Sequence, residues 1–343
     1  MRHLLNTLFI TSEDAYLTLD GENVVVSRGQ QEMGRFPLHT LSAILSFSYA
    51  GASPALMGAC GSRQINLTFC SPRGRFLARV SGQSQGNVLL RRTQYRMADD
   101  PFQSCNLATM FIQGKIYNAR QVIARTRRDH PMRVDESTLL AACDTLKELQ
   151  GQVAQAESLD SLRGLEGVAA STYFGVFDHL ILNEKETFYF HGRNRRPPLD
   201  AVNALLSFAY SILAGDCASA LESVGLDAYV GFLHRDKPGR TSLALDLMEE
   251  LRAPMADRFV LTLINNRMIS PDAFQVRESG AVLLSDAGRK LFLQQWQKKK
   301  QEQITHPFLE EKIPWGLVPY MQALLLARYL RGDLDGYPPF LWK

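Results

Sequence analysis

The chain has 343 residues, of which 45% are hydrophobic and 21% are charged, and its formal net charge is +3. A globular chain of this length and composition can bury at least one full core and is expected to form two domains. It contains no run approaching the roughly 20 apolar residues of a membrane-spanning helix, and its start does not resemble a signal peptide, so we expect a cytoplasmic protein without a membrane partner.

The N-terminal part of the chain shows the pattern of strands and turns. Apolar positions alternate over residues 15–20, and the turn-like Asp20-Gly21-Glu22 separates this stretch from the next apolar run. The predicted strands are residues 7–11, 15–20, 23–27, 64–70 and 75–81, with a short helix at 54–61. We therefore predict a small β-sandwich-like domain over residues 1–86.

After Gly86 the pattern changes to long amphipathic runs with apolar residues at helical spacing. Pro- and Gly-containing breaks separate these runs. The predicted helices are residues 87–97, 102–128, 136–156, 160–182, 199–214, 216–223, 242–252, 255–266, 286–303 and 316–331. We therefore predict a larger all-α domain over residues 87–343 and assign the whole chain to the α+β class.

One short motif suggests a different enzyme class. Residues 82–86 match the G-x-S-x-G nucleophile elbow of α/β-hydrolases, between a predicted strand and a predicted helix. Such a hydrolase needs alternating strands and helices downstream to present its acid and its histidine, whereas this chain continues as helices. We interpret the motif as a glycine-rich turn between domains.

The cysteines indicate neither a disulfide framework nor a zinc site. They are odd in number, widely spaced, and never arranged as C-x-x-C. We expect buried thiols at Cys60, Cys70, Cys105, Cys143 and Cys217.

The most informative cluster joins His234 to a predicted helix through a polar turn. Asp246 and Glu249 are three residues apart on that helix, so both carboxylates project from one face. A single histidine after an apolar triplet is more often a packed core residue, and acids on helices usually face solvent. Here the acids lie beside the apolar sequence 243–248, where an unpaired carboxylate suffers a desolvation penalty. The pattern therefore indicates a metal ion or a basic partner.

Glu166 is the only acid within the small and apolar residues 164–171. Close packing between helices requires such small residues, and from the sequence alone it is the favoured interpretation. The glycines on both sides would also let a ligand approach. Packing leaves the glutamate itself unexplained.

Basic residues gather in local clusters, which matter because the net charge is too small to indicate a polyanionic partner. Arg193, Arg195 and Arg196 precede two prolines, and arginines fixed in this way can bind phosphates. The lysine triplet at 298–300, on a polar helix, is more often a solvated face. We therefore take the three arginines as candidate DNA contacts.

Four ordered motifs together resemble the CRISPR-associated integrase family, the endonuclease-like subunit of spacer acquisition. They are Gly164-Leu165-Glu166-Gly167, residues 195–210, Gly231-Phe232-Leu233-His234 and residues 245–254. The resemblance covers essentially the whole chain, because the β-rich start and the helical remainder also look like that family's two-domain plan. The segment 86–92 and the overall length most resemble the I-C branch.

The resemblance implies that Glu166, His234 and Glu249 bind a metal ion, with Asp246 as a supporting catalytic carboxylate. Many members of the family carry aspartate at the position of Glu249, and the adjacent Glu250 leaves open which of the two reaches the ion. Helical geometry favours Glu249, which shares the face of Asp246. Two carboxylates and an imidazole suit Mg²⁺ or Mn²⁺, and the absence of thiolate ligands argues against structural zinc.

The resemblance also implies a reaction and a set of partners. Captured double-stranded DNA fragments would be joined through their 3′-hydroxyl ends to the CRISPR repeat by transesterification, which needs no covalent protein intermediate. A homodimer is implied, two of which flank a dimer of a small second adaptation protein in a heterohexamer. Two alternatives stay open. One is a catalytically silent helical DNA-binding scaffold, in which the acids pair with arginines such as Arg163 and Arg252. The other is a metal-dependent DNase that cuts without joining.

Overall fold

The computed structural model describes residues 7–12, 14–41, 43–71, 76–80, 82, 88–194 and 196–343. The chain divides into two compact units, one made of Met1–Gln85 with Leu284–Glu302 and the other of Gly86–Leu283 with Gln303–Lys343. The segment Leu284–Glu302, which contains α9 (Asp286–Gln301), groups with the first unit, unlike in the sequence-based division. That 1–86 and 87–343 are separate domains stays a prediction.

The described residues of the Met1–Gln85 part of the first unit form two sheets, one short α-helix and one short helical turn. A four-stranded sheet has the order β1-β5-β6-β7, in which β1, β5 and β6 are parallel and β7 is antiparallel to β6. A three-stranded antiparallel sheet has the order β2-β3-β4. The elements are β1 (Thr7–Ile10), β2 (Tyr16–Asp20), β3 (Asn23–Arg28), β4 (Gln31–Pro37), η1 (Leu38–Thr40), β5 (Ala43–Ser46), α1 (Pro54–Ser62), β6 (Asn66–Cys70) and β7 (Phe76–Val80).

Both sheets and α1 contribute to one hydrophobic core. Leu17 and Val24 come from the three-stranded sheet, Ile44 and Leu67 from the four-stranded sheet, and Leu56 from α1, and all five are fully buried. Apolar residues alternate along β2, and β3 follows a turn-like segment, which made both strands predictable. The strands β4 and β5 were missed, because β4 is almost entirely exposed and β5 has only four residues.

The second unit is mostly helical. Its helices are α2 (Val88–Asp99), α3 (Pro101–Asp129), α4 (Glu136–Val153), α5 (Leu159–Gly175), α6 (Ala201–Ser223), α7 (Ser242–Leu251), α8 (Arg258–Asn265) and α10 (Val318–Leu330). Short helical turns are η2 (Phe177–Leu180), η3 (Arg252–Asp257), η4 (Pro271–Ala273) and η5 (Trp315–Leu317). The α+β class predicted from the sequence is confirmed.

The expectation of an all-α region needs one correction. Two antiparallel strand pairs occur among the helices, β8 (Phe274–Val276) with β9 (Val282–Leu284) and β10 (Gln303–Thr305) with β11 (Lys312–Pro314). Each strand has only three residues, too few for a periodic pattern to reveal.

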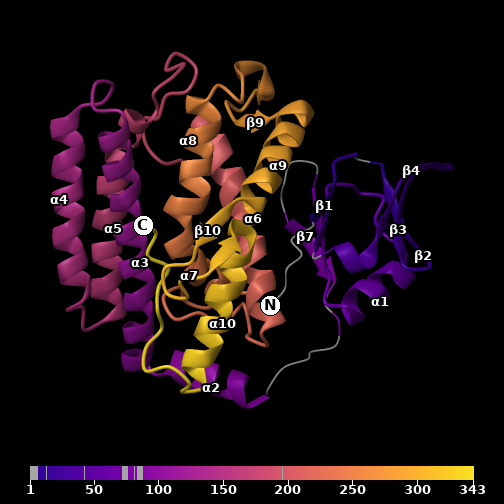
Figure 1. The fold of residues 1–343 in the computed structure, drawn as a ribbon, viewed down its shortest axis with the longest axis horizontal. Coiled ribbons are helices and arrows are strands. Elements are labelled where there is room, and N and C mark those ends of the chain that lie inside the picture. The colour runs from indigo at the N-terminus through magenta and orange to yellow at the C-terminus, as the bar shows by residue number, and fades with distance from the viewer. Residues whose placement is uncertain are drawn as a thin grey trace. The chain divides into compact units, whose positions relative to one another are not determined.

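The long helix α3 organises the second unit. Asp100 caps its first turn, accepting hydrogen bonds from the backbone of Phe102 and Gln103, and Pro101 follows at the first helical position. Helices α4, α5 and α7 all pack against α3, and Figure 1 shows α3, α4 and α5 lying side by side. Helix α3 therefore packs against two helices, α5 and α7, that carry site residues predicted from the sequence.

Helix α6 is continuous, although the sequence analysis divided it at Gly215 into two helices. One described helix, α6, is long and apolar enough by length and composition to cross a membrane, a feature that the sequence analysis did not recognise. Of its apolar window, 67% is buried within the fold, as in a core helix. The expected buried thiols are confirmed for Cys60, Cys105, Cys143 and Cys217, whereas the side chain of Cys70 is outside the described part.

The link between α7 and α8 is one π-helical turn, η3. Pro254 predicts a break here, because it has no N–H to donate and does not fit the interior of a regular α-helix. The chain instead widens into the π turn and continues as α8. This turn carries Arg252 and Asp257, and both side chains line the cavity described next.

Candidate functional site

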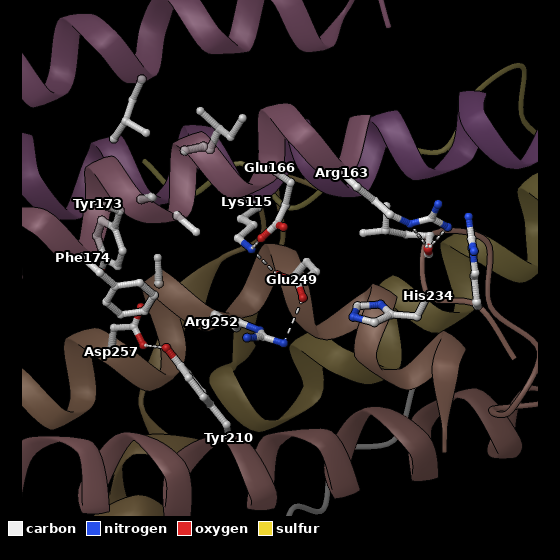
Figure 2. A pocket seen from close by; sticks show the side chains of 18 of the residues that line it. Lys115, Arg163, Glu166, Tyr173, Phe174, Tyr210, His234, Glu249, Arg252 and Asp257 are labelled. Atoms are coloured by element: carbon white, nitrogen blue, oxygen red, sulfur yellow. Dashed lines mark hydrogen bonds and ion pairs between the residues drawn. The ribbon is translucent and has the colours of Figure 1, made fainter. Parts of the chain in front are cut away.

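A cavity of about 450 Å³ lies in the second unit. Figure 2 shows its wall, to which α3, α5, α6, α7, η3 and the loop after Gly231 contribute side chains. All three predicted metal ligands line it, namely Glu166, His234 and Glu249. Elements that are far apart in the sequence therefore bring these three residues to one place.

Two of the predicted ligands share one basic side chain. Lys115 of α3 forms an ion pair through Nζ with Glu166 Oε1 of α5, and the same Nζ lies 2.8 Å from Glu249 Oε2 of α7 (Figure 2). The side chain of Glu249 is only 4% exposed, against 28% for Glu166. The buried acid and the half-buried acid are therefore held together by a single ammonium group.

Glu249 is a carboxylate stabilised by surrounding positive charge. Burial alone would raise its pKa, but Arg252, Lys115 and His234 together outweigh burial and lower the pKa to about 2. Arg252 Nη2 lies 2.9 Å from Glu249 Oε1. Glu249 Oε2 accepts no well-directed hydrogen bond from the described residues, although Lys115 Nζ is close to it. The Lys115 ammonium is therefore the cation that now faces this buried oxygen of Glu249.

Asp246 orients His234 and does not join the other carboxylates. Its side chain is fully buried and accepts backbone hydrogen bonds from Phe232 (2.6 Å), Leu233 (3.0 Å) and His234 (3.0 Å). Asp246 Oδ1 also lies 2.6 Å from Nδ1 of His234. A carboxylate in this position fixes the ring orientation and leaves Nε2 as the nitrogen available to the cavity.

The loop that carries His234 is held from two further directions. A Cβ atom at Gly231 would lie 2.9 Å from Asp246 Oδ2, so only glycine lets the loop approach α7 this closely. From α5, Arg163 donates to the carbonyl oxygen of Leu233 through Nη2 at 2.7 Å and through Nε at 3.2 Å. The histidine is therefore presented on a restrained loop.

Glu250 lies on a different side of α7 from the cavity. It is fully buried and accepts hydrogen bonds from Gln322, Tyr337 and the backbone of Phe340, while Glu249 lines the cavity. Burial raises the pKa of Glu250 to about 7, although these hydrogen bonds lower it. The structure thus distinguishes two adjacent acids that helical spacing alone could not separate.

Sequence reasoning missed part of the cavity wall. Lys115 was not singled out, although it is the single charge in the otherwise uncharged sequence 111–116, which is the signal that could have found it. Tyr210 and Asp257 form a hydrogen bond at another part of the wall, and Arg252 lies over the Tyr210 ring at 5.0 Å (Figure 2). Burial raises the pKa of Asp257 to about 6.

The three arginines predicted to contact DNA differ in their surroundings. Arg193 donates from Nη1 to Asn203 Oδ1 (2.6 Å) and from Nη2 to Ser207 Oγ (3.1 Å), so its guanidinium is bound to α6. Arg196 is exposed, and Arg195 lies outside the described residues. Contact between these arginines and DNA stays a prediction.

The residues present fit a divalent cation in their chemistry. Carboxylate oxygens and an imidazole nitrogen are suitable donors for Mg²⁺ or Mn²⁺. Among the residues that the structure describes, no three acidic, histidine or cysteine side chains are already gathered closely enough to hold a metal ion. Lys115 instead supplies positive charge between Glu166 and Glu249, so the ammonium group would have to move for a cation to reach both acids. Metal binding by the three residues stays a prediction.

Replacing Lys115 by methionine tests this competition. Without the ammonium, we expect Mn²⁺ to bind on the order of tenfold more tightly, because the cation no longer displaces an ion pair worth ~1.4 kcal/mol. In EDTA the same variant should lose about 3 kcal/mol of unfolding free energy, because the buried Glu249 loses a partner. Calorimetric titration with Mn²⁺ and urea denaturation measure the two effects. Unchanged Mn²⁺ affinity in a folded variant would contradict the competition.

Comparison with known proteins gives consistent matches. The family model for the CRISPR associated protein Cas1 matches residues 8–298. A CRISPR-associated endonuclease Cas1 from Chlorobaculum tepidum is 48% identical over 343 residues, covering 100% of both chains. A solved casposase bound to an integration product superposes with a TM-score of 0.83 at 22% identity, covering 99% of this chain and 95% of that one. A Cas6-RT-Cas1–Cas2 complex gives a TM-score of 0.80 at 24% identity, covering 99% of this chain and 36% of that longer chain.

Proposed function

This chain belongs to the Cas1 family of CRISPR-associated endonucleases, and from that premise we propose that it is a divalent-metal-dependent DNA integrase and endonuclease of CRISPR adaptation. It would join the 3′-hydroxyl ends of captured double-stranded DNA fragments to the CRISPR repeat. The observation that carries this proposal is the convergence of Glu166, His234 and Glu249 on one cavity.

The proposed reaction exchanges one phosphodiester bond for another. The 3′-oxygen of the fragment bonds to a phosphorus atom of the repeat, the bond from that phosphorus to its original 3′-oxygen breaks, and the hydroxyl proton is returned to the departing oxygen. Water in place of the fragment's hydroxyl would give cleavage without joining, so the outcome depends on which hydroxyl is positioned. A divalent cation held by Glu166, His234 and Glu249 would polarise the phosphate.

The protein's own groups prepare the cavity for a DNA phosphate. Asp246 keeps the His234 ring in one orientation, with Nε2 available. Lys115 and Arg252 add positive charge to the wall, which favours an anionic backbone. Arg196 is exposed and is the described member of the arginine cluster best placed to meet DNA outside the cavity.

Finer assignments belong to the same proposal. We assign the chain to the I-C subtype from its segment 86–92 and its length. The partners would be a second copy of the chain and a small second adaptation protein in a heterohexamer, in line with the solved complex of a fold relative that contains Cas1 and Cas2. The working compartment would be the cytoplasm, where the DNA lies.

A strand-joining assay tests the proposed function. A labelled DNA fragment and a repeat-containing DNA are incubated with the protein and its small partner, with Mg²⁺, with Mn²⁺ and with EDTA. We expect joined product with either ion and none in EDTA, because the carboxylates then lack the cation that polarises phosphorus. His234→Ala and Glu166→Ala should lose the product under all conditions.

Two other outcomes would replace the proposal. Release of cut DNA without joined product would indicate a metal-dependent DNase. Binding of DNA without joining or cutting under any metal condition would indicate the scaffold. The scaffold is the stronger second candidate because Arg252 does pair with Glu249, as that alternative predicts.

A further inference from the structure

The segment formed by residues 337–342 lies against the helices that carry the candidate site. It has no regular secondary structure, yet Tyr337, Phe340 and Trp342 are each at most 4% exposed. Phe340 packs edge-on against His306 and Trp315, with ring centroids 5.5 Å and 5.8 Å away. An irregular segment buried to this extent is held by specific contacts.

The centre of these contacts is Glu250. Its Oε1 accepts hydrogen bonds from Gln322 Nε2 (2.9 Å) and from the hydroxyl of Tyr337, and its Oε2 accepts one from the backbone N–H of Phe340 (2.7 Å). Both carboxylate oxygens are therefore occupied. Consecutive residues on an α-helix point about 100° apart, so a fixed direction for Glu250 also fixes the direction of Glu249.

The same segment joins α7 to α3. Asn118 of α3 donates from Nδ2 to the backbone oxygens of Glu250 (2.7 Å) and Phe340 (2.6 Å), and its Oδ1 accepts from the backbone of Trp342 (2.8 Å). Lys115, which contacts Glu249 and Glu166, lies three residues before Asn118 on α3. Residues at this spacing lie on the same side of a helix, so the two side chains are neighbours.

Gly114 marks the closest approach in this arrangement. A Cβ atom there would lie 2.9 Å from Cβ of Glu250 and 3.1 Å from Cβ of Pro339. Helix α3, helix α7 and the 337–342 segment are thus packed together one residue away from Lys115. Trp342, the last residue of the 337–342 segment, contacts two arginines: the guanidinium of Arg258 lies 4.5 Å from its ring centroid and that of Arg125 lies 5.3 Å away.

We propose that Glu250 is a positioning residue for the reaction: through the 337–342 segment it locks α7 against α3 and so holds Glu249 where it meets Glu166. This inference rests on the proposed function, because it concerns the position of Glu249, which is a proposed metal ligand. It gives the two adjacent acids distinct roles. Glu249 acts in the cavity, and Glu250 acts only through Glu249.

The test uses the full-length protein with Glu250→Gln, which keeps the shape of the side chain but replaces one acceptor oxygen by an NH₂ group. Mn²⁺ affinity is measured by the electron paramagnetic resonance of free Mn²⁺, and the half-saturating Mn²⁺ concentration is measured in strand joining at saturating DNA. We expect the Mn²⁺ affinity to fall and the half-saturating Mn²⁺ concentration to rise, each roughly tenfold, which is the effect of losing a group that orients a ligand. Tyr337→Phe, which removes one donor, should shift them in the same direction by less.

Two matched variants separate positioning from general loss of stability. Asn265→Ala removes a hydrogen-bonding side chain that holds the backbone at Leu180 and Leu182, so it should lower the melting temperature without changing the Mn²⁺ affinity. The exchange Glu250→Gln with Gln322→Glu keeps one acid and one amide in contact and should restore much of the affinity.

The outcomes are distinguishable. Weaker Mn²⁺ binding by Glu250→Gln, rescued by the exchange and absent in Asn265→Ala, supports the inference. A Glu250→Gln protein that melts earlier but binds Mn²⁺ as the wild type does overturns it and leaves the proposed function intact. Wild-type protein that neither binds Mn²⁺ nor joins DNA overturns both.

Discussion

Glu249→Gln is expected to reduce metal-dependent strand joining by more than about 100-fold. Removal of groups that merely orient metal ligands costs about 10–100-fold in affinity or activity, so the loss of a ligand itself should exceed that range. Glu249 is the most buried of the three proposed ligands, with a side chain only 4% exposed. The measurement is the initial rate of joining at saturating Mn²⁺.

A second variant separates chemistry from folding. Glu249→Gln also leaves Lys115 and Arg252 without their buried partner, whereas Glu166 is 28% exposed and its loss should disturb the fold less. Glu166→Gln should therefore lose a similar share of activity with a smaller fall in melting temperature. The exposed Glu148→Gln on α4 serves as the control. Near-normal joining by a folded Glu166→Gln protein would remove Glu166 from the site.

The carboxylate of Glu249 should also make the stability of the protein depend on pH. The pKa of Glu249 is about 2 in the folded protein against an ordinary 4.5, so its contribution to stability is complete above pH 4.5 and is lost as the pH falls towards 2. The difference in unfolding free energy between wild type and Glu249→Gln should therefore shrink over that acid range. Urea denaturation at several pH values measures it.

Asp246→Asn is expected to be the most damaging substitution outside the proposed ligands. The buried carboxylate accepts three backbone N–H groups and contacts His234 Nδ1, whereas an asparagine has one acceptor oxygen and turns an NH₂ group towards donors. Each buried donor left without a partner costs about 1–3 kcal/mol, so we expect a loss of roughly 3 kcal/mol or more. Joining activity should also fall, because the His234 ring is no longer oriented.

The companion substitution His234→Ala makes this prediction specific. It removes the imidazole but leaves the three backbone hydrogen bonds to Asp246, so stability should fall far less than in Asp246→Asn. Activity should fall at least as much, because a proposed ligand is lost. Denaturation and joining assays on both proteins give the comparison. Equal stability of Asp246→Asn and wild type would show that the loop does not depend on this carboxylate.

The sequence alone predicted the fold class and indicated most of the candidate site residues. Alternating apolar residues indicated β2, and the turn-like residues after it indicated the start of β3. Helical spacing indicated α3 and α7, because this pattern follows from the geometry of a helix. The motifs around Glu166, His234 and Glu249 were recognisable as short runs of sequence, and all three residues line one cavity. The exposed β4 escaped because it lacks an apolar face.

Only the tertiary structure decided how those residues are used. Helical spacing put Asp246 and Glu249 on one face, yet Asp246 binds the loop of His234 while Glu249 meets Lys115. The choice between Glu249 and Glu250 depends on the 337–342 segment, which occupies Glu250. Lys115 could be recognised as part of the site only from the packing of α3 against both α5 and α7. Local sequence sets the periodicity of an element, whereas the partner of a buried charge is set by packing between distant elements, which no short pattern records.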